Sequence, residues 1–406
     1  MNKPPPISMA AYRKEARYAA LIALLLLGTA CGGTPDRDAT SAPVNQAAST
    51  AEADTAESTD ERADGEETAP PAEEETYELR FANFLGPDAA QIRANLWWAE
   101  QVEARTDGRV TVEFFHSGAL LDATDTLPGI GDGRADMGYA VHFYHPGELA
   151  LSSISELPFE VANPQVQTRA FNQLYRENDD FRAEWEAMGV HVLHFNPSGV
   201  IILGSGEQIT SLDQLSGMQV RAVGYAAEAL AERGANPIAM PAPEIYESLQ
   251  RGLLNGYSSF PFEVIAAQQL QEVAPYVLDL GLGNYLITAA PINLELWNSL
   301  PSDIQDVMTE VSEELSDSAV WDIYAEVEAE VCDAIRQAGG EVSVLPEEEV
   351  QGWRDDLGDR FVEDWLDSNG GADSTAAQFL DDYRGAIEEF AAGADFESGV
   401  RTCAGV

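Results

Sequence analysis

Two patterns of hydrophobic and polar residues follow one another along most of the chain. Short segments have the two-residue alternation of a strand, and longer segments have the periodicity of a helix. The alternation from Tyr77 to Phe84 predicts a first strand, and apolar residues between Asp88 and Arg105 recur at helical spacing. The same two patterns predict strands at 110–115, 137–142, 190–195, 200–204, 218–223 and 237–240, and helices at 122–132, 166–188, 226–233 and 243–253. Because strands that alternate with helices form parallel βαβ units, we predict an α/β fold.

The pattern changes towards the C-terminal end of the chain. Ser258 and Ser259 are predicted to begin one more strand, but beyond Tyr285 the periodicity is mainly helical, with long runs at 302–316 and 320–338. We therefore expect long helices in this part of the chain.

The first 31 residues have the pattern of a lipoprotein signal. A basic start is followed by the apolar segment 18–27, by three small residues and by Cys31. The apolar segment is far shorter than the ~20 residues that a membrane-spanning helix needs. We predict cleavage before Cys31 and acylation of its thiol, which would attach an exported protein to the extracytoplasmic face of the cell membrane. Because Gly28 stands where leucine is usual, a secretory signal with an incidental cysteine is the alternative.

Residues 32–76 contain no aromatic residue and are rich in Ala, Thr, Ser, Pro and acidic residues. Such a segment buries too little apolar surface to offset the entropy lost on ordering, so we predict a disordered acidic linker. The remaining residues, 77–406, are enough for two lobes with separate hydrophobic cores.

The charge of the chain excludes some classes of partner. It carries 70 acidic and 22 basic residues and a formal charge of −48, and lysine is absent after Lys14. So acidic a protein is a poor partner for nucleic acid or for an anionic membrane surface. The composition is similar to that of proteins that work in high salt, where screening relieves the self-repulsion.

Arg221 is the most informative candidate for a binding residue, because basic residues are scarce in this chain. It ends the run GMQVR, at the end of a predicted strand, in a chain where basic residues are scarce. A guanidinium group presents a rigid fork that matches a carboxylate with two parallel hydrogen bonds, which indicates an anionic ligand. An internal salt bridge to one of the many acidic residues is the alternative.

Arg221 belongs to a series of motifs that resembles the solute-binding proteins of TRAP transporters, the DctP-type family. The series consists of ARTDGRVTVEFFHSGALL (104–121), GRADMGYA (133–140), ELPFE (156–160), ITSLDQLSGMQVRAVG (209–224) and PIAMPAPEIYESLQRGLLNG (237–256). The resemblance extends from Tyr77 to about Gly370. It implies a two-lobed fold like that of periplasmic binding proteins, with the ligand cleft between the lobes. It also implies that 77–198 and 287–326 form lobe I, and that 199–286 and 327–406 form lobe II with the C-terminal helices.

The resemblance implies that the protein captures a small organic carboxylate and delivers it to the membrane subunits of a TRAP-type permease. It also implies that Arg221 binds the carboxylate, without a cofactor. Ile201 stands where a second arginine is frequent in the family, so we predict a monocarboxylate. Further candidate ligand-binding residues are Asn196, Ser258 and Ser259 among the polar residues and Tyr139, Phe143 and Tyr144 among the aromatic ones. For the polar candidates, a role in a turn or a strand start is the alternative.

Two other functions remain open from the residues. A sensor of the same fold would present the ligand to a receptor in place of a permease. An exported enzyme for an acidic metabolite is less favoured, because no pairing of a nucleophile with a base is visible. His142 and His145 form an HxxH pair, but the chain lacks the further ligand pattern of a metal site, so we predict none.

Cys332 and Cys403 remain as an even pair once Cys31 is set aside. An exported protein permits a disulfide, and we predict one between them, which would hold the C-terminus in place. Two unpaired thiols are the alternative.

Overall fold

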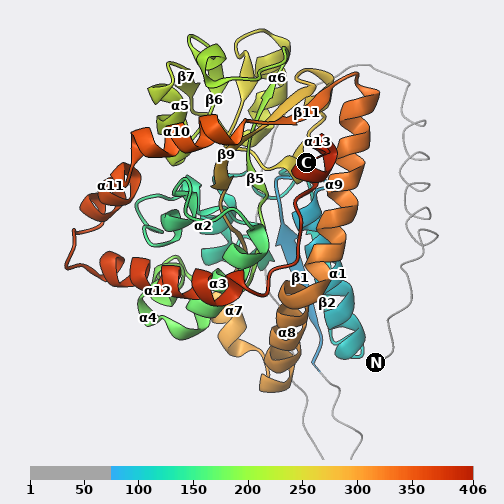
Figure 1. Ribbon diagram of the computed structural model, residues 1–406. Coiled ribbons are helices and arrows are strands. Elements are labelled where there is room, and N and C mark those ends of the chain that lie inside the picture. The colour runs from blue at the N-terminus through green and yellow to red at the C-terminus, as the bar shows by residue number, and fades with distance from the viewer. Residues whose placement is uncertain (1–74, 406) are drawn as a thin grey trace, which may run out of the picture. The chain divides into compact units, whose positions relative to one another are not determined.

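A computed structural model describes residues 75–405, in which two β-sheets are each covered by helices (Figure 1). Cys31 and nearly all of the predicted linker at 32–76 lie outside the described residues. We call the unit built on the first sheet lobe I and the unit built on the second sheet lobe II.

The sheet of lobe I has five strands in the order β2-β1-β3-β10-β4. These are β1 (Tyr77–Ala82), β2 (Val110–Phe115), β3 (Met137–Gly138), β4 (Val190–Asn196) and β10 (Thr288–Asn293). β1 pairs in parallel with β2 and β3, whereas β10 runs antiparallel to β3 and β4. The chain therefore returns to lobe I after it has built most of lobe II.

The sheet of lobe II has six strands in the order β11-β9-β5-β8-β6-β7. These are β5 (Val200–Ser205), β6 (Gln219–Arg221), β7 (Asn236–Ile238), β8 (Gly256–Tyr257), β9 (Tyr276–Asn284) and β11 (Glu341–Val344). β6 pairs in parallel with both β7 and β8. The carboxyl ends of these three strands consequently meet at one edge of the sheet.

The helices fall into three groups. Lobe I carries α1 (Ala90–Arg105), α2 (Thr126–Gly131), α3 (Pro164–Glu177), α4 (Asp179–Ala187), α7 (Leu294–Ser299) and α8 (Ser302–Glu314), and lobe II carries α5 (Gly224–Glu232) and α6 (Ile245–Gln250). The C-terminal part consists of a π-helical turn (Leu315–Ala319), α9 (Val320–Gln337), α10 (Glu347–Leu357), α11 (Arg360–Ser368), α12 (Thr375–Ala391) and α13 (Gly399–Ala404). No helix within residues 75–405 is both long enough and apolar enough to cross a bilayer.

One predicted helix and one predicted strand differ from the observed elements. The helix predicted at 166–188 is two helices, because the side chain of Asn178 accepts a hydrogen bond from the backbone N–H of Phe181 at 2.9 Å and caps α4. Ser258 and Ser259 follow β8 and do not begin a strand. Ser259 has φ of 48°, a left-handed conformation that ends an extended segment.

The prediction of a mainly helical region beyond Tyr285 overlooked β10 and β11. All residues of β10 but the last are buried, so the strand lacks the alternation by which half-buried strands are identified. β11 has only four residues and pairs in parallel with β9, far from it in sequence. Both strands are therefore defined by their pairing partners more than by local pattern.

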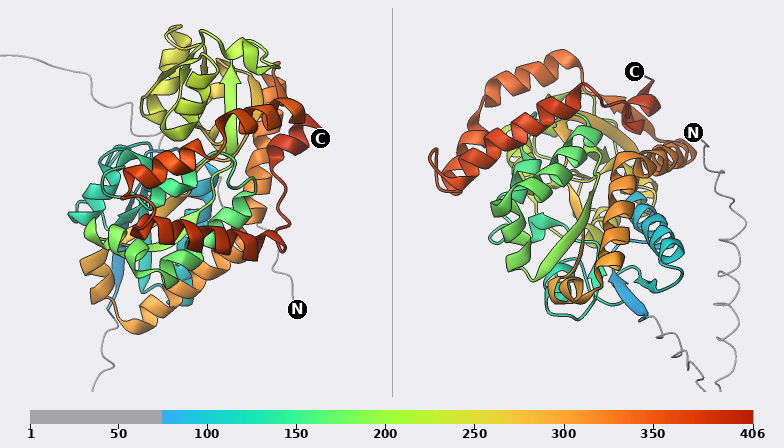
Figure 2. Two further views of the ribbon diagram at one scale, coloured as in Figure 1. Left: turned by 60° about the vertical axis from the view of Figure 1, so that its left-hand side comes forward. Right: turned by 90° about the horizontal axis from the view of Figure 1, so that it is seen from below.

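The C-terminal helices do not all stay with lobe II, to which the prediction assigned 327–406. α12 packs on lobe I, where Phe379 lies 4.9 Å from Phe181 and Tyr383 lies 5.4 Å from Phe171 between ring centroids. Figures 1 and 2 show the chain passing from lobe II through α10 and α11 to α12, beside α3. The apolar face of α12 packs on lobe I because aromatic side chains of α3 and α4 form a cluster there.

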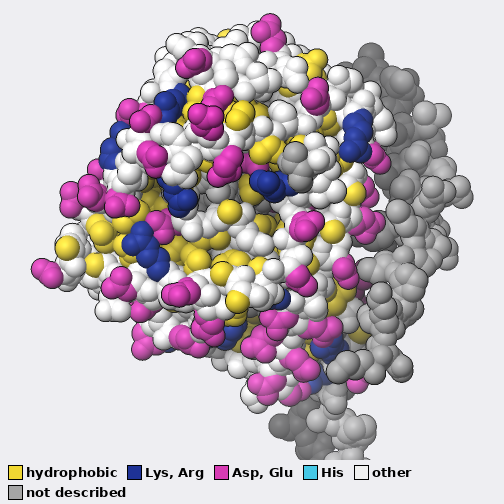
Figure 3. All heavy atoms as spheres, viewed as in Figure 1, with side chains coloured by type: hydrophobic (Ala, Val, Ile, Leu, Met, Phe, Trp, Pro, Cys, Tyr) yellow, Lys and Arg dark blue, Asp and Glu magenta, His cyan; other side chains and the backbone are white. Residues whose placement is uncertain are grey.

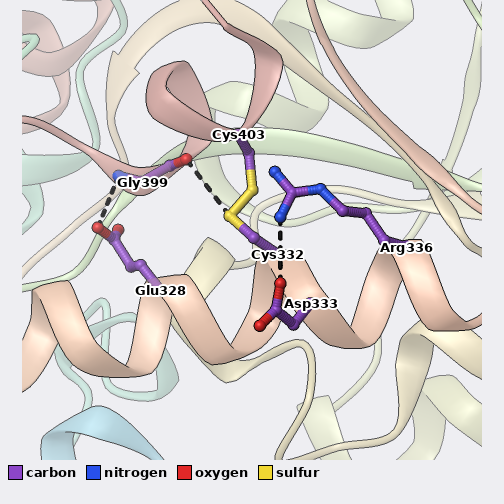
Figure 4. Close-up of a disulfide and its surroundings, with 6 residues drawn as sticks. All are labelled: Glu328, Cys332, Asp333, Arg336, Gly399 and Cys403. Atoms are coloured by element: carbon purple, nitrogen blue, oxygen red, sulfur yellow. Dashed lines mark hydrogen bonds and ion pairs between the residues drawn. A yellow bond between two sulfur atoms is a disulfide. The ribbon is translucent and has the colours of Figure 1, made fainter.

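A disulfide joins Cys332 of α9 to Cys403 of α13, with the Cα atoms 5.8 Å apart (Figure 4). One turn before Cys332, the carboxylate of Glu328 accepts a hydrogen bond of 2.7 Å from the backbone N–H of Gly399. The bridge and this hydrogen bond attach α13 to α9 at two points.

Candidate functional site

Arg221 is the last residue of β6 and its side chain is almost fully buried. Its Nε donates to the carbonyl of Met240 at 3.1 Å, and Nη1 donates to the carbonyls of Ser258 and Ser259 at 3.2 and 2.5 Å. These carbonyls belong to the segments that follow β7 and β8, the two strands beside β6. The edge where three parallel strands end therefore positions the guanidinium group.

The alternative of an internal salt bridge does not hold for Arg221 within residues 75–405. None of the described carboxylates forms an ion pair with it, and its guanidinium group donates hydrogen bonds to three neutral carbonyl groups. Burial of a charge is unfavourable unless an opposite charge or strong hydrogen bonds compensate. The guanidinium group is therefore hydrogen-bonded on one side but has no anionic partner in the described part of the chain.

The guanidinium group borders a cavity that both lobes line. Lobe I contributes an aromatic wall of Phe84, Tyr139, Phe143 and Tyr144, and lobe II contributes Arg221, Ala242, Ser259 and Phe260. Ser198, Tyr285 and Thr288, where the chain crosses between the lobes, complete the lining. Ligands of two-lobed α/β proteins bind at this kind of position, at strand ends between lobes.

The aromatic wall is continuous. The ring centroids of Phe84 and Tyr139 are 5.2 Å apart, those of Phe84 and Tyr144 are 6.1 Å apart, and those of Phe143 and Tyr144 are 4.1 Å apart. The Tyr144 hydroxyl also accepts a hydrogen bond of 3.5 Å from the backbone N–H of Ala242 in lobe II. This contact joins a lining residue of lobe I to a lining residue of lobe II.

The hydroxyl groups of Tyr285 and Ser198 are buried in the cavity, where a ligand could provide a hydrogen-bond partner for each. Burial raises the pKa of Tyr285, and the nearby charge of Arg221 opposes this rise. The Oγ atom of Ser198 is buried and has no hydrogen-bond partner among the described residues. A buried hydroxyl without a partner is costly, so both groups are suited to binding a polar atom within the cavity.

The structure brings five of the predicted ligand-binding residues to one cavity: Arg221, Tyr139, Phe143, Tyr144 and Ser259. Ser258 holds Arg221 through its carbonyl group and does not itself line the cavity. Asn196 ends β4 and is fully buried outside the lining. These two residues support or adjoin the cavity without facing it.

Sequence analysis did not find Ser198, Tyr285 or Thr288. Ser198 follows Asn196 by two positions, so its place at the interlobe crossing was a usable signal. Tyr285 and Thr288 had no such signal, because their place depends on β9 and β10, which the local pattern did not predict.

The structure also shows where Ile201 lies, the residue that stands where a second arginine is frequent in the family. Ile201 in β5 is fully buried and pairs with Pro261, so it lies in the sheet and not in the cavity lining. Among the described residues that line the cavity, Arg221 is the only charged one. The lining therefore offers one full positive charge.

The HxxH pair does not form a shared site in the described structure. His142 is buried with its Nε2 3.0 Å from Oε1 of Glu156, and His145 is half-buried. No group of three or more His, Cys, Asp or Glu side chains in residues 75–405 is arranged to hold a metal ion.

Comparison with known proteins assigns the family. The family model described as bacterial extracellular solute-binding protein, family 7 (DctP), matches residues 81–362. The C4-dicarboxylate-binding periplasmic protein DctP of Rhodobacter capsulatus is 24% identical over 315 residues, which are 76% of this chain and 91% of the relative.

Solved structures give the same result. A TRAP periplasmic solute-binding protein from Desulfovibrio salexigens, in an open complex, is 26% identical with a TM-score of 0.65, over 79% of this chain and 98% of that one. A TRAP solute-binding protein from Rhodoferax ferrireducens, solved with copurified benzoate, has a TM-score of 0.71 at 19% identity, over 78% and 99% of the two chains. Since the family model spans more than half of its length, the chain belongs to family 7 of the bacterial extracellular solute-binding proteins.

Proposed function

We propose that this protein captures a small organic monocarboxylate outside the cytoplasm and delivers it to the membrane subunits of a TRAP-type permease. The observation that carries the proposal is Arg221, a buried guanidinium group that faces a cavity between two lobes and lacks an anionic partner among the described residues. A ligand carboxylate would supply that partner through the fork of the guanidinium group.

The single charge of the lining favours a monocarboxylate. A dicarboxylate would bury its second charge among aromatic rings and hydroxyl groups, with no second cation in the described lining to compensate. The Rhodobacter capsulatus relative is by its name a C4-dicarboxylate-binding protein, so this preference would separate the two proteins.

The transport role rests on the family, whose solved members are TRAP solute-binding proteins. We further propose that the chain is exported and anchored by an acylated Cys31, with the acidic segment up to residue 76 as a tether. Cys31→Ser would then move the protein from the membrane fraction to the soluble fraction of the cell envelope. Retention of this variant in the membrane fraction would contradict the anchor.

The ligand class is tested by thermal shift of the purified full chain with matched acids. We expect butyrate or benzoate to raise the melting temperature more than succinate or terephthalate at equal concentration, because a ligand that binds only the folded state stabilises it. A larger shift with the dicarboxylates would contradict the monocarboxylate preference. No shift with any carboxylate, and no acid found by mass spectrometry of the copurified material, would contradict carboxylate binding.

A further inference from the structure

The cavity around Arg221 is lined by one cationic side chain and by several hydroxyl groups. Burial raises the pKa values of Tyr144 and Tyr285, and in both cases the charge of Arg221 opposes the rise, which places these hydroxyl groups near the guanidinium group. Burial also raises the pKa of Tyr139, but there the opposing influence comes from Thr288. The lining therefore combines an anion-binding group, Arg221, with the hydroxyl groups of several tyrosines, of Thr288 and of two serines.

Much of the lining is aromatic. Six aromatic residues line this one cavity: Phe84, Tyr139, Phe143, Tyr144, Phe260 and Tyr285. Phe84 meets Tyr144 edge to face, with 82° between the ring planes, and Tyr139 at 48°. Rings in these mutual orientations surround the cavity from more than one direction, which suits edge-to-face and offset contacts with a planar aromatic ligand.

The polar groups of the lining, apart from Arg221, are hydroxyl groups. The hydroxyl groups of Ser198, Tyr285 and Thr288 are all buried, line the cavity and have no partner in the described part of the chain, and Ser198 Oγ belongs to the smallest side chain of the three. A serine hydroxyl both donates and accepts, so a hydroxyl group on the ligand would satisfy it, whereas a second carboxylate would bring an uncompensated charge.

We propose that the ligand is a hydroxylated aromatic monocarboxylate, with its carboxylate on Arg221, its ring against Phe84 and Tyr139, and its hydroxyl group on Ser198. This inference rests on the proposed function and specifies the substrate class of the same site. A saturated ring of similar size would fill the same space, but it would forgo the directional contacts between rings.

The ring is tested by calorimetry of the full chain with benzoate and cyclohexanecarboxylate, which share a carboxylate and a six-membered carbon ring. We expect benzoate to bind about tenfold more tightly, as a few ring contacts imply. Phe84→Leu should reduce this ratio towards one. Phe171→Leu, a change of the same type at a buried aromatic residue outside the cavity, should leave the ratio unchanged.

The hydroxyl group is tested with 3-hydroxybenzoate and 4-hydroxybenzoate. We expect one of the two isomers to bind about fivefold to tenfold more tightly than benzoate, and Ser198→Ala to bring the ratio of the two affinities close to one. Loss of the ratio in Ser198→Ala distinguishes a contact with the ligand from a general effect on folding, because both ligands report on the same variant.

The outcomes separate the inference from the function on which it rests. Equal or tighter binding of cyclohexanecarboxylate overturns the aromatic class while carboxylate binding stands. The assignment of the ligand's hydroxyl group to Ser198 is overturned if neither hydroxybenzoate binds more tightly than benzoate. It is also overturned if the preference for a hydroxybenzoate persists in Ser198→Ala. Failure of every acid tested overturns the proposed function together with the inference.

Discussion

Two regions of the described structure bury charge without an opposite charge beside it. Arg221 faces the cavity and is held by three backbone carbonyl groups. The second region contains Glu263 and Glu328, which are almost fully buried. Glu263 accepts hydrogen bonds from Gln91 Nε2 at 2.6 Å and from the backbone N–H of Gly199 at 3.3 Å. Each carboxylate has one oxygen without a hydrogen-bond partner among the described residues.

The two regions compensate for the burial of an ionisable group in different ways. A guanidinium group keeps its proton at any ordinary pH, so Arg221 stays charged and its environment calls for an anion. A carboxyl group can take up a proton instead. Burial raises the pKa of Glu263 to about 7 and that of Glu328 to about 8, and the charge of Glu263 adds to the effect on Glu328. The cation therefore indicates a ligand, whereas the acids indicate bound protons.

Arg221→Ala should give the largest effect, because it removes the only charge in the described lining. Loss of the partner of a desolvated carboxylate costs about 3–5 kcal/mol, or roughly 10²–10⁴-fold in affinity for benzoate. Calorimetry measures this loss, and Arg221→Lys should recover only part of it, since the fork is gone.

Arg251→Ala is the matched control for that prediction. Arg251 is exposed and forms a surface pair with Glu247, so its removal also deletes one positive charge but leaves the cavity intact. Binding by Arg221→Ala within threefold of the unmodified chain would mean that Arg221 is not the anion partner.

Removal of the disulfide should give the next largest effect, on stability. Cys332 and Cys403 are 71 residues apart in sequence, and closing a loop of that length stabilises the folded chain by roughly 4 kcal/mol in the chain-entropy model. We expect the double variant Cys332→Ser and Cys403→Ser to lose about this free energy of unfolding in urea. The loss would also weaken the hold on Gly399, the donor to Glu328.

Reduction provides the control for the disulfide. Under a strong reductant the unmodified chain and the double variant should unfold at the same urea concentration. A difference that persists under reductant would assign the effect to the serine substitutions themselves.

Glu328→Gln tests the protonation of the acidic region. A carboxyl group with a raised pKa in the folded chain binds more protons when folded, so its unfavourable contribution is absent below pH 4.5 and grows as the pH rises through about 8. We expect Glu328→Gln to increase the free energy of unfolding by roughly 5 kcal/mol at pH 9 and to change it little at pH 4. Glutamine keeps an oxygen that accepts from Gly399.

Glu326→Gln is the control on the same helix, since Glu326 is exposed. It should show no comparable difference between the two pH values. A gain for Glu328→Gln that is equal at pH 4 and pH 9 would show that Glu328 does not change its protonation in this range.

Salt should affect the two buried regions least and the surface most. Figure 3 shows Asp and Glu side chains spread widely over the visible face, and the chain carries 70 acidic residues against 22 basic ones. The Debye length falls from ~30 Å at 0.01 M to ~3 Å at 1 M salt, so the melting temperature should rise over this range as self-repulsion is screened. The affinity for benzoate should change less, because Arg221 is buried. A flat melting temperature would contradict the interpretation of the composition as adapted to high salt.

The sequence alone determined the features that depend on residue type and local order. The series of motifs from residue 104 to residue 256 identified the family, and Arg221 stood out because a permanent charge at a strand end is informative wherever the chain folds. Four of the five strands of lobe I and three of the six strands of lobe II could be predicted from the local pattern of hydrophobic and polar residues.

Tertiary structure alone decided which residues meet and which charges lack partners. Ser198 joins Arg221 because the chain crosses between the lobes from β4 to β5, and Tyr285 and Thr288 join it because the chain returns from β9 to β10 in lobe I. The roles of Ser258 and Ser259 differ because the chain turns between them. Burial of Glu263 and Glu328 likewise depends on α9, the interlobe crossing and the C-terminal segment together. Burial and proximity arise from segments far apart in sequence, and no local pattern carries that information.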